Sequence, residues 1–91
     1  MTYKSTDKNQ KHIVNALRKV GAIVKMVYTV PNLFDIIVYY KGKTYCVEIK
    51  QDKKKKLTPG ELQCKEDIES VGVKYWIIYS IEDALKMINI K

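Results

Sequence analysis

The sequence has few of the residues that most often build metal clusters. Its 91 residues include two cysteines, Cys46 and Cys64, and one histidine, His12. The cysteines fit no metal-binding spacing, so we interpret them as buried thiols of a protein kept in a reducing compartment. A single histidine on a basic stretch is typical of a surface residue, and we assign it no catalytic role.

Long hydrophobic runs are also absent. No apolar stretch approaches the roughly 20 residues that a membrane-spanning helix needs. The first residues, Met1 to Ser5, have no apolar segment behind them, so we expect no secretory signal, a cytoplasmic protein and no membrane partner. There is no internal repeat and no linker. The length suits one domain that spans residues 1–91.

Acidic residues are few relative to basic ones. Seventeen lysines and arginines against ten acids give a net charge of +7 and a pI of about 9.4. This balance favours a polyanionic partner, with nucleic acid first and an anionic membrane surface second. Hydrophobic residues make up 46% of the chain, which is typical of a folded protein. A chain this short has a modest core, and dimerisation would help to stabilise it.

The periodicity of apolar residues predicts the element order α-β-β-β-α-β-α. The elements cover residues 5–20, 22–29, 34–40, 44–49, 59–71, 74–80 and 81–90. Because a helix connects the third strand to the fourth, these two strands can lie parallel in a mixed sheet flanked by helices. The fourth strand is almost entirely apolar or aromatic, so we expect it at the centre of the sheet.

Thr58 and Glu61 form a predicted capping box at the start of the second helix, with Pro59 in its first turn. Cys64 lies on the apolar stripe of this helix, so we expect it to be buried against the sheet.

The segment from Phe34 to Ile49 carries the strongest functional signal. Its two strand-like runs flank Lys41-Gly42, which predicts a hairpin. A two-residue loop places Asp35 opposite Glu48, where directly opposed residues share a face with Cβ atoms about 5 Å apart. Lys50, two residues beyond Glu48, belongs to the same face.

Two carboxylates placed opposite each other repel and destabilise a sheet. A divalent cation removes the conflict, because Mg²⁺ binds through one or two carboxylates together with waters and phosphate oxygens. A lysine beside such a site suits a phosphate or a metal-bound water. The alternative is a surface hairpin on which Asp35, Glu48 and Lys50 form an ordinary salt-bridge cluster.

These residues resemble the motif of a known nuclease superfamily. Pro31, Asp35 and Glu48-Ile49-Lys50 resemble the PD-(D/E)xK motif, and more narrowly that of the virus-type replication-repair nuclease (VRR-NUC) domain, which is related to archaeal Holliday junction resolvases. The later segment 57–63, Leu-Thr-Pro-Gly-Glu-Leu-Gln, also matches. Leu33 departs from the glycine usual in that family. The resemblance implies a restriction-endonuclease-like αβββαβα core.

The resemblance also implies a metal-dependent endonuclease without an organic cofactor. Asp35 and Glu48 would bind Mg²⁺ or Mn²⁺, with the carbonyl of Ile49 as a further ligand. Lys50 would orient or deprotonate the attacking water and stabilise the charge that develops on the phosphate.

The resemblance implies roles for two more positions, and each of them has an equally simple alternative role. Its first helix often holds an acidic metal ligand near a glutamine. Gln10 fits the glutamine, and Asp7 is the nearest acid, although Asp7 can equally cap the helix. Gln63 matches a glutamine associated with the active site, and it can equally be a surface residue.

Four consecutive lysines, Lys53, Lys54, Lys55 and Lys56, follow the hairpin. They are interpreted either as a solubilising loop or as a site that captures the phosphate backbone, and their place directly after Lys50 favours the second. Asn32 is a candidate for the wall of the same groove.

The resemblance favours structure-selective DNA cleavage in DNA repair. The substrate would be a Holliday junction or other branched DNA, cut by a homodimer with two matching sites. A nicking or flap nuclease without junction preference is the alternative within this class. Outside it, the sequence is also compatible with a basic nucleic-acid-binding module without catalysis, or with a subunit that docks through its aromatic strands. A phage-encoded enzyme acting in the host cytoplasm would suit the family.

Overall fold

The computed structural model describes residues 8–90, and it confirms the predicted element order. The elements are α1 (Lys8–Lys19), β1 (Ile23–Met26), β2 (Ile36–Tyr40), β3 (Lys43–Ile49), α2 (Pro59–Ser70), β4 (Tyr75–Ile78) and α3 (Ile81–Met87). Most are shorter than predicted at their ends, where hydrogen-bonded structure gives way to turns.

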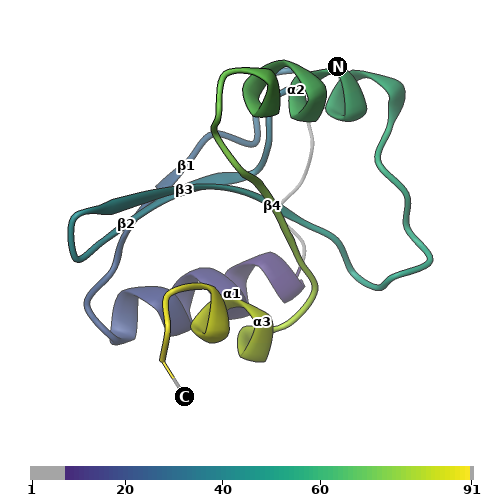
Figure 1. The fold of residues 1–91 in the computed structure, drawn as a ribbon. Coiled ribbons are helices and arrows are strands. Elements are labelled where there is room, and N and C mark those ends of the chain that lie inside the picture. Colours follow the sequence, from purple (N-terminus) through teal and green to yellow (C-terminus); the bar gives the residue numbers. More distant parts are fainter. Residues whose placement is uncertain (1–7, 91) are drawn as a thin grey trace.

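The four strands form one mixed sheet in the order β1-β2-β3-β4. β1 and β3 each pair antiparallel with β2, whereas β3 and β4 are parallel, as expected for strands joined through a helix. Helices α1 and α3 cover one face and α2 lies on the other (Figure 1). The mixed sheet flanked by helices is therefore confirmed.

The expected central position of the fourth strand is wrong. Within residues 8–90, β4 is an edge strand that pairs only with β3. It is nevertheless apolar because helices lie over both faces of the sheet here (Figure 1), and Tyr75 and Ile78 are almost fully buried. Two amides at the ends of the strand that do not pair with β3 are satisfied by side chains. The amide of Tyr75 donates to Glu69 Oε2 (3.2 Å) and that of Tyr79 to Asp83 Oδ2 (2.9 Å).

The hairpin turn between β2 and β3 has the predicted two residues. Lys41 and Gly42 have φ angles of 47° and 80°, so both are left-handed, as a two-residue hairpin of the primed type requires. The resulting register pairs Tyr40 with Lys43 and continues to Ile36 with Val47. The turn is confirmed, and so is the predicted register from Tyr40–Lys43 to Ile36–Val47. The predicted pair of Asp35 with Glu48 is not part of the ladder, because the amide of Asp35 bonds to the carbonyl of Val47 instead.

The core fills the space between the sheet and the α1–α3 layer. Its fully buried members come from α1, β2, β3 and α3, and they are Ile13, Leu17, Ile36, Val38, Val47 and Ala84. Alternate residues of a strand point to opposite faces, so these apolar side chains direct the intervening residues of β2 and β3 toward α2. The candidate site lies on that second face.

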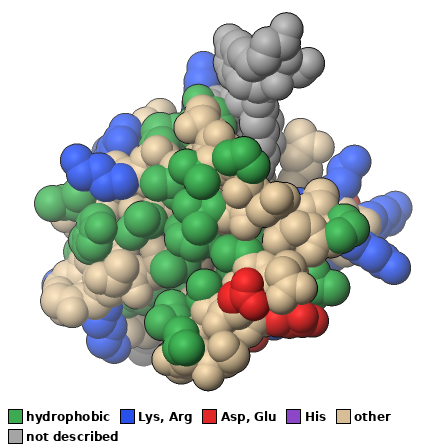
Figure 2. Space-filling model, turned by 90° about the horizontal axis from the view of Figure 1, so that it is seen from above, with side chains coloured by type: hydrophobic (Ala, Val, Ile, Leu, Met, Phe, Trp, Pro, Cys, Tyr) green, Lys and Arg blue, Asp and Glu red, His purple; other side chains and the backbone are tan. Residues whose placement is uncertain are grey.

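The second face is only partly covered. In the described part of the chain α2 has no buried residue, and Val71 at its end is 77% exposed. The expectation of buried thiols is not met in full, because Cys46 and Cys64 are both only half-buried. Figure 2 shows hydrophobic side chains gathered over the middle of the face that carries α2, with basic side chains at its edges. Within residues 8–90, no helix has the length and apolar character to cross a bilayer.

Candidate active site

Asp35 lies at the entrance to β2 and is 1% exposed. Regular pairing of β2 with β3 ends at Ile36–Val47, one step before Asp35. There the amide of Asp35 donates to the carbonyl of Val47 (3.0 Å), and Asp35 Oδ2 accepts the amide of Ile49 (2.8 Å). The acid is thus clamped against the end of β3, although it does not form a regular ladder pair with Glu48.

Glu48 and Lys50 lie on the same face of β3. Glu48 is 1% exposed, and its Oε2 lies 3.4 Å from Lys50 Nζ. The spacing of two residues predicted this shared face, and the contact agrees with it. Ile49, between them, contributes only main chain to this side, because its own side chain is buried in the core.

Glu61 is a site residue that the sequence analysis missed. Its Oε1 lies 2.8 Å from Lys50 Nζ and also accepts the amide of Thr58 (2.9 Å). Thr58 Oγ1 accepts the amide of Glu61 in return, which completes the predicted capping box. The spacing of Thr58 and Glu61 did single out Glu61, but a capping box explains that spacing completely. The second role of Glu61 becomes visible only in the folded chain, where α2 lies over the end of β3.

The two carboxylates hold Lys50 in its charged form. Burial by itself would lower the pKa of Lys50, but the hydrogen bond to Glu61 and the charges of Glu48 and Glu61 outweigh it and raise that pKa. Burial likewise tends to raise the pKa of Glu61, whereas Lys50 and the amide of Thr58 lower it overall. Lys50 is therefore an ammonium, and Glu61 a carboxylate, near neutral pH.

Tyr75 on β4 closes the site from the side of the sheet. Its hydroxyl donates to the carbonyl of Leu33 (3.4 Å), and its ring packs edge-on against Phe34. Burial strongly raises the pKa of this hydroxyl, and the charges of Glu48, Glu61 and Asp35 add to the effect. All three acids therefore lie close enough to act on one buried phenol, which stays protonated.

Asn32 joins the loop before β2 to the start of α2. Its φ of 59° is left-handed, and its side chain occupies the space where Gly60 would carry a Cβ atom. Only glycine permits this approach. The contact holds the first turn of α2, and with it Glu61, close to the β2–β3 hairpin. Asn32 thus has a structural role beside the segment that carries Glu61. Its predicted place in the wall of a DNA groove stays a prediction.

Gln63 does not join the acid cluster. It is exposed on α2, where its amide donates to Asp67 Oδ1 (2.9 Å). Gln10 is buried on α1. Next to it, Asn9 Nδ2 donates to the carbonyls of Lys50 (3.3 Å) and Tyr79 (3.1 Å), which ties the start of α1 to the ends of β3 and β4. Asp7 lies outside the described residues.

The lysine run forms an exposed loop beyond β3. All four side chains, Lys53 to Lys56, are exposed. Asp52 orders the start of the loop, because its Oδ1 accepts the amide of Lys54 (2.8 Å) and its carbonyl accepts that of Lys55 (3.1 Å). The loop extends away from the sheet between β3 and α2 (Figure 1), and it begins directly after Lys50.

The donor set fits a hard divalent cation with an incomplete protein shell. Among residues 8–90, no group of three or more His, Cys, Asp or Glu side chains is arranged to hold a metal ion. Asp35 and Glu48 are both buried acids, and they would supply the carboxylate oxygens. Mg²⁺ characteristically binds one or two carboxylates and keeps waters or phosphate oxygens in its other positions, so two acids are compatible with it.

The αβββαβα order and the mixed sheet with helices on both faces define an α/β fold. The chain has the fold of a VRR-NUC domain. It is similar to a solved structure described as a "VRR_NUC domain" with a TM-score of 0.72 and 23% sequence identity, over 89% of this chain and 90% of that one. No protein-family model matches the chain. No curated protein matches it significantly.

Proposed function

We propose that the chain is a single-domain, metal-dependent nuclease that hydrolyses DNA phosphodiester bonds. The observation that carries the proposal is the burial of Asp35 and Glu48, together with the contact between Glu48 and Lys50 at the end of β3. The two acids are 1% exposed and the lysine Nζ lies 3.4 Å from Glu48. Burying a charged group costs free energy, so an ordinary salt-bridge cluster would leave its acids at the surface. The burial of two acids therefore favours a functional site.

Asp35 and Glu48 would hold Mg²⁺ or Mn²⁺, with the carbonyl of Ile49 as a further ligand. When bound, such an ion lowers the pKa of a coordinated water and polarises the phosphoryl oxygen. The clamp of Asp35 on the amide of Ile49 fixes the end of β3, so the acids are preorganised before substrate arrives.

Lys50 would position the attacking water and neutralise the charge that develops on the phosphate. The raised pKa of Lys50 favours its ammonium form. This supports a role in stabilising the negative charge on the phosphate better than a role as the base that deprotonates the water. Glu61 holds the ammonium in place through its 2.8 Å contact. We also retain Asp7 as a further metal ligand and Gln63 as a residue that contacts the substrate near the site.

The lysine loop and Asn32 would bind the DNA backbone. Lys53 to Lys56 are exposed beside the end of β3, where contacts with phosphates position a substrate without reading its sequence. The charge of +7 supports the same partner.

For the oligomeric state and the substrate, we favour a homodimer that cuts branched DNA such as a Holliday junction. The incompletely covered second face supports it, because Ile23 and Tyr39 are register partners there and are 57% and 42% exposed. An apolar sheet face of this kind is suited to a second copy, and a two-fold dimer would present two matching sites. Nicking or flap cleavage by a monomer is the alternative.

A binding module without catalysis is the second candidate function, and the charge of the chain favours it. Two buried acids beside a lysine loop would weaken binding to a polyanion unless a cation intervened, which argues against this candidate.

The test compares the wild-type protein with Lys50→Ala and with Lys43→Ala on labelled four-way junction, flap and linear duplex. Lys43 lies at the far end of β3 and serves as the matched loss of one charge. We expect cleavage of at least one branched substrate only with Mg²⁺ or Mn²⁺, near-normal rates for Lys43→Ala, and binding without cleavage for Lys50→Ala. Equal cleavage by all three proteins, or DNA binding unaffected by metal without any cleavage, would refute the proposal.

A further inference from the structure

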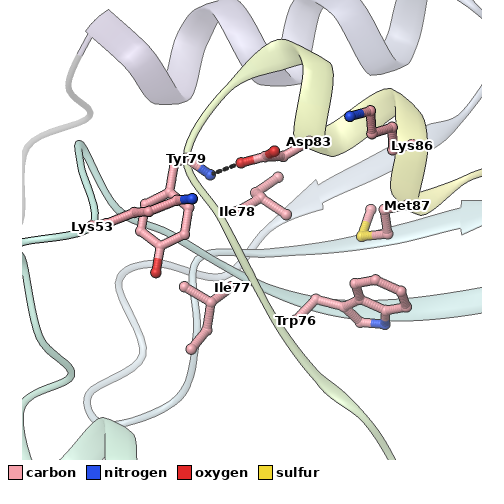
Figure 3. Close-up of a pocket in the computed structure, with 8 residues that line it drawn as sticks. All are labelled: Lys53, Trp76, Ile77, Ile78, Tyr79, Asp83, Lys86 and Met87. Carbon is pink, nitrogen blue, oxygen red and sulfur yellow. Dashed lines mark hydrogen bonds between the residues drawn. The ribbon is translucent and has the colours of Figure 1, made fainter. Parts of the chain in front are cut away.

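A groove runs along the free edge of β4, between the lysine loop and α3. It has a volume of about 340 Å³ and is lined by Lys53, Trp76, Ile77, Ile78, Tyr79, Asp83, Lys86 and Met87. Figure 3 shows these side chains, with Asp83, Lys86 and Met87 projecting from α3 and Tyr79 near Lys53. None of these residues except Lys53 belongs to the site described above.

The groove combines positive charge with aromatic surface. Lys53 and Lys86 are exposed at it, and Lys74 lies just outside, with its Nζ 4.0 Å from the centre of the Trp76 ring. Trp76 and Tyr79 are half-buried. The Trp76 ring packs edge-on against Tyr45 and has Lys74 over its face, so a base that stacks on that face takes the place of Lys74. The one acidic side chain of the lining, Asp83, is engaged with the amide of Tyr79 (2.9 Å). The groove is therefore basic overall and lined by two rings.

The groove adjoins the main chain that carries Lys50 of the candidate active site. Asn9 Nδ2 donates to the carbonyls of both Lys50 and Tyr79, so the main chain at the groove lies beside the main chain at Lys50. Lys53 lies three residues after Lys50 in the same loop. A strand that leaves the site past Lys50 therefore meets Tyr79 and Lys53 first.

We infer that the β4 groove binds an unpaired DNA strand adjacent to the scissile phosphate. Lysines that follow a backbone, together with aromatic rings that accept bases, are the features by which proteins hold single strands without sequence preference. Lys53, Lys74 and Lys86 contact phosphates, and Tyr79 and Trp76 contact bases. A duplex cannot offer its base faces to the rings, because those faces are stacked and paired. The inference rests on the proposed nuclease function and extends it, since it names the part of a branched substrate that the chain grips.

The experiment uses the only tryptophan of the chain as a local reporter. Tryptophan emission is recorded while an oligothymidine is added in EDTA, so that no cleavage occurs, and anisotropy of a labelled oligonucleotide reports total binding. We expect the emission of Trp76 to change in parallel with binding. A blunt duplex with the same number of phosphates should bind with little change in emission.

Two variants and one control test the lining. Lys86→Ala should weaken binding of the oligothymidine about three-fold or more and flatten its salt dependence, because one phosphate contact is lost. Tyr79→Leu should weaken it by about five-fold or more, the effect of losing one stacked base. Lys43→Ala removes the same charge far from the groove and should change affinity less than about two-fold, because it loses no phosphate contact. Thermal melting of each variant verifies that it is folded.

Three results would overturn the inference. Binding without any change in Trp76 emission places the strand elsewhere. If Lys86→Ala and Lys43→Ala weaken binding equally, the loss of affinity is due to net charge and not to a contact in the groove. Equal emission changes with duplex and single strand show that no unpaired bases are needed. These measurements are made without metal, so they do not depend on whether the protein cleaves DNA. Conversely, a negative result for the groove would not contradict the proposed cleavage.

Discussion

The side chain of Asn32 fills the space into which a Cβ atom would project from Gly60. This contact joins two segments that are far apart in the sequence, the loop before β2 and the first turn of α2. Because Glu61 follows Gly60 directly, the same contact sets how closely Glu61 approaches Lys50. The geometry of the candidate site thus depends on a residue with no charge.

Gly60→Ala should destabilise the protein by about 1–3 kcal/mol, the usual effect of overpacking a close contact. Elsewhere in the first turn of a helix the same change would be favourable, because alanine has the higher helix propensity. Urea unfolding measures the difference. Asn32→Gly removes the obstructing side chain and tolerates the φ of 59°, so the double variant should regain most of the loss. Simple additivity of the two changes would contradict the contact.

Mg²⁺ or Mn²⁺ should stabilise the wild-type protein against heat. A metal at about ten times its Kd contributes about 1.4 kcal/mol, which corresponds to a rise in Tm of roughly 6–11 °C in a domain of this size. Asp35→Asn keeps an oxygen that can accept the amide of Ile49 but removes the charge, so its Tm should not respond to metal. Differential scanning fluorimetry with and without EDTA measures both. A metal response retained in Asp35→Asn would place the ion elsewhere.

Glu61→Gln should reduce stability at neutral pH and make it less sensitive to acid. The folded-state pKa of Glu61 is lowered, so its contribution is complete above the ordinary glutamate value and is lost as the pH falls through the lowered one. The gap in stability between wild type and variant should therefore narrow as the pH falls from about 5 toward about 3. Glutamine at this position retains the capping box.

Urea unfolding at several pH values measures this gap. Glu66→Gln, an exposed change on the same helix, is the control and should leave the acid sensitivity close to that of the wild type. A gap for Glu61→Gln that does not depend on pH would mean that the contact between Glu61 and Lys50 adds no stability in solution.

Lys41→Asn should stabilise the hairpin by a few tenths of a kcal/mol up to about 1 kcal/mol, because asparagine adopts a left-handed conformation more readily than lysine. The φ of Lys41 is 47°. The turn lies at the opposite end of β3 from Glu48 and Lys50, so the cleavage rate should not change. Unfolding by urea and a cleavage assay provide the two measurements, and a destabilised variant would contradict the primed turn.

The sequence was most informative where short-range rules decide the structure. Alternation of side chains and the two-residue turn at Lys41-Gly42 fix the register of the hairpin, and with it the face shared by Glu48 and Lys50. The capping box at Thr58 was predictable for the same reason. These features depend on neighbours along the chain or directly across one turn.

Features set by long-range packing were not accessible in the same way. The position of β4 at the edge depends on how the helices cover the sheet, and apolar composition alone suggests a central strand. The contact of Glu61 with Lys50 requires the path of the loop between β3 and α2, which the lysine run does not specify. The glutamine of the family motif was assigned to Gln63, yet Gln63 bonds to Asp67 and Glu61 is the residue of that segment that reaches Lys50.

The two acids that cap the outer edge of β4 have a consequence for aggregation. Edge strands with unpaired amides are templates on which other chains extend a sheet into fibrils. Here Glu69 and Asp83 already occupy the amides of Tyr75 and Tyr79, and of the amides that face outward only that of Ile77 lies between them. An incoming strand would have to displace two carboxylates to add on, so this edge is a poor template for strand addition.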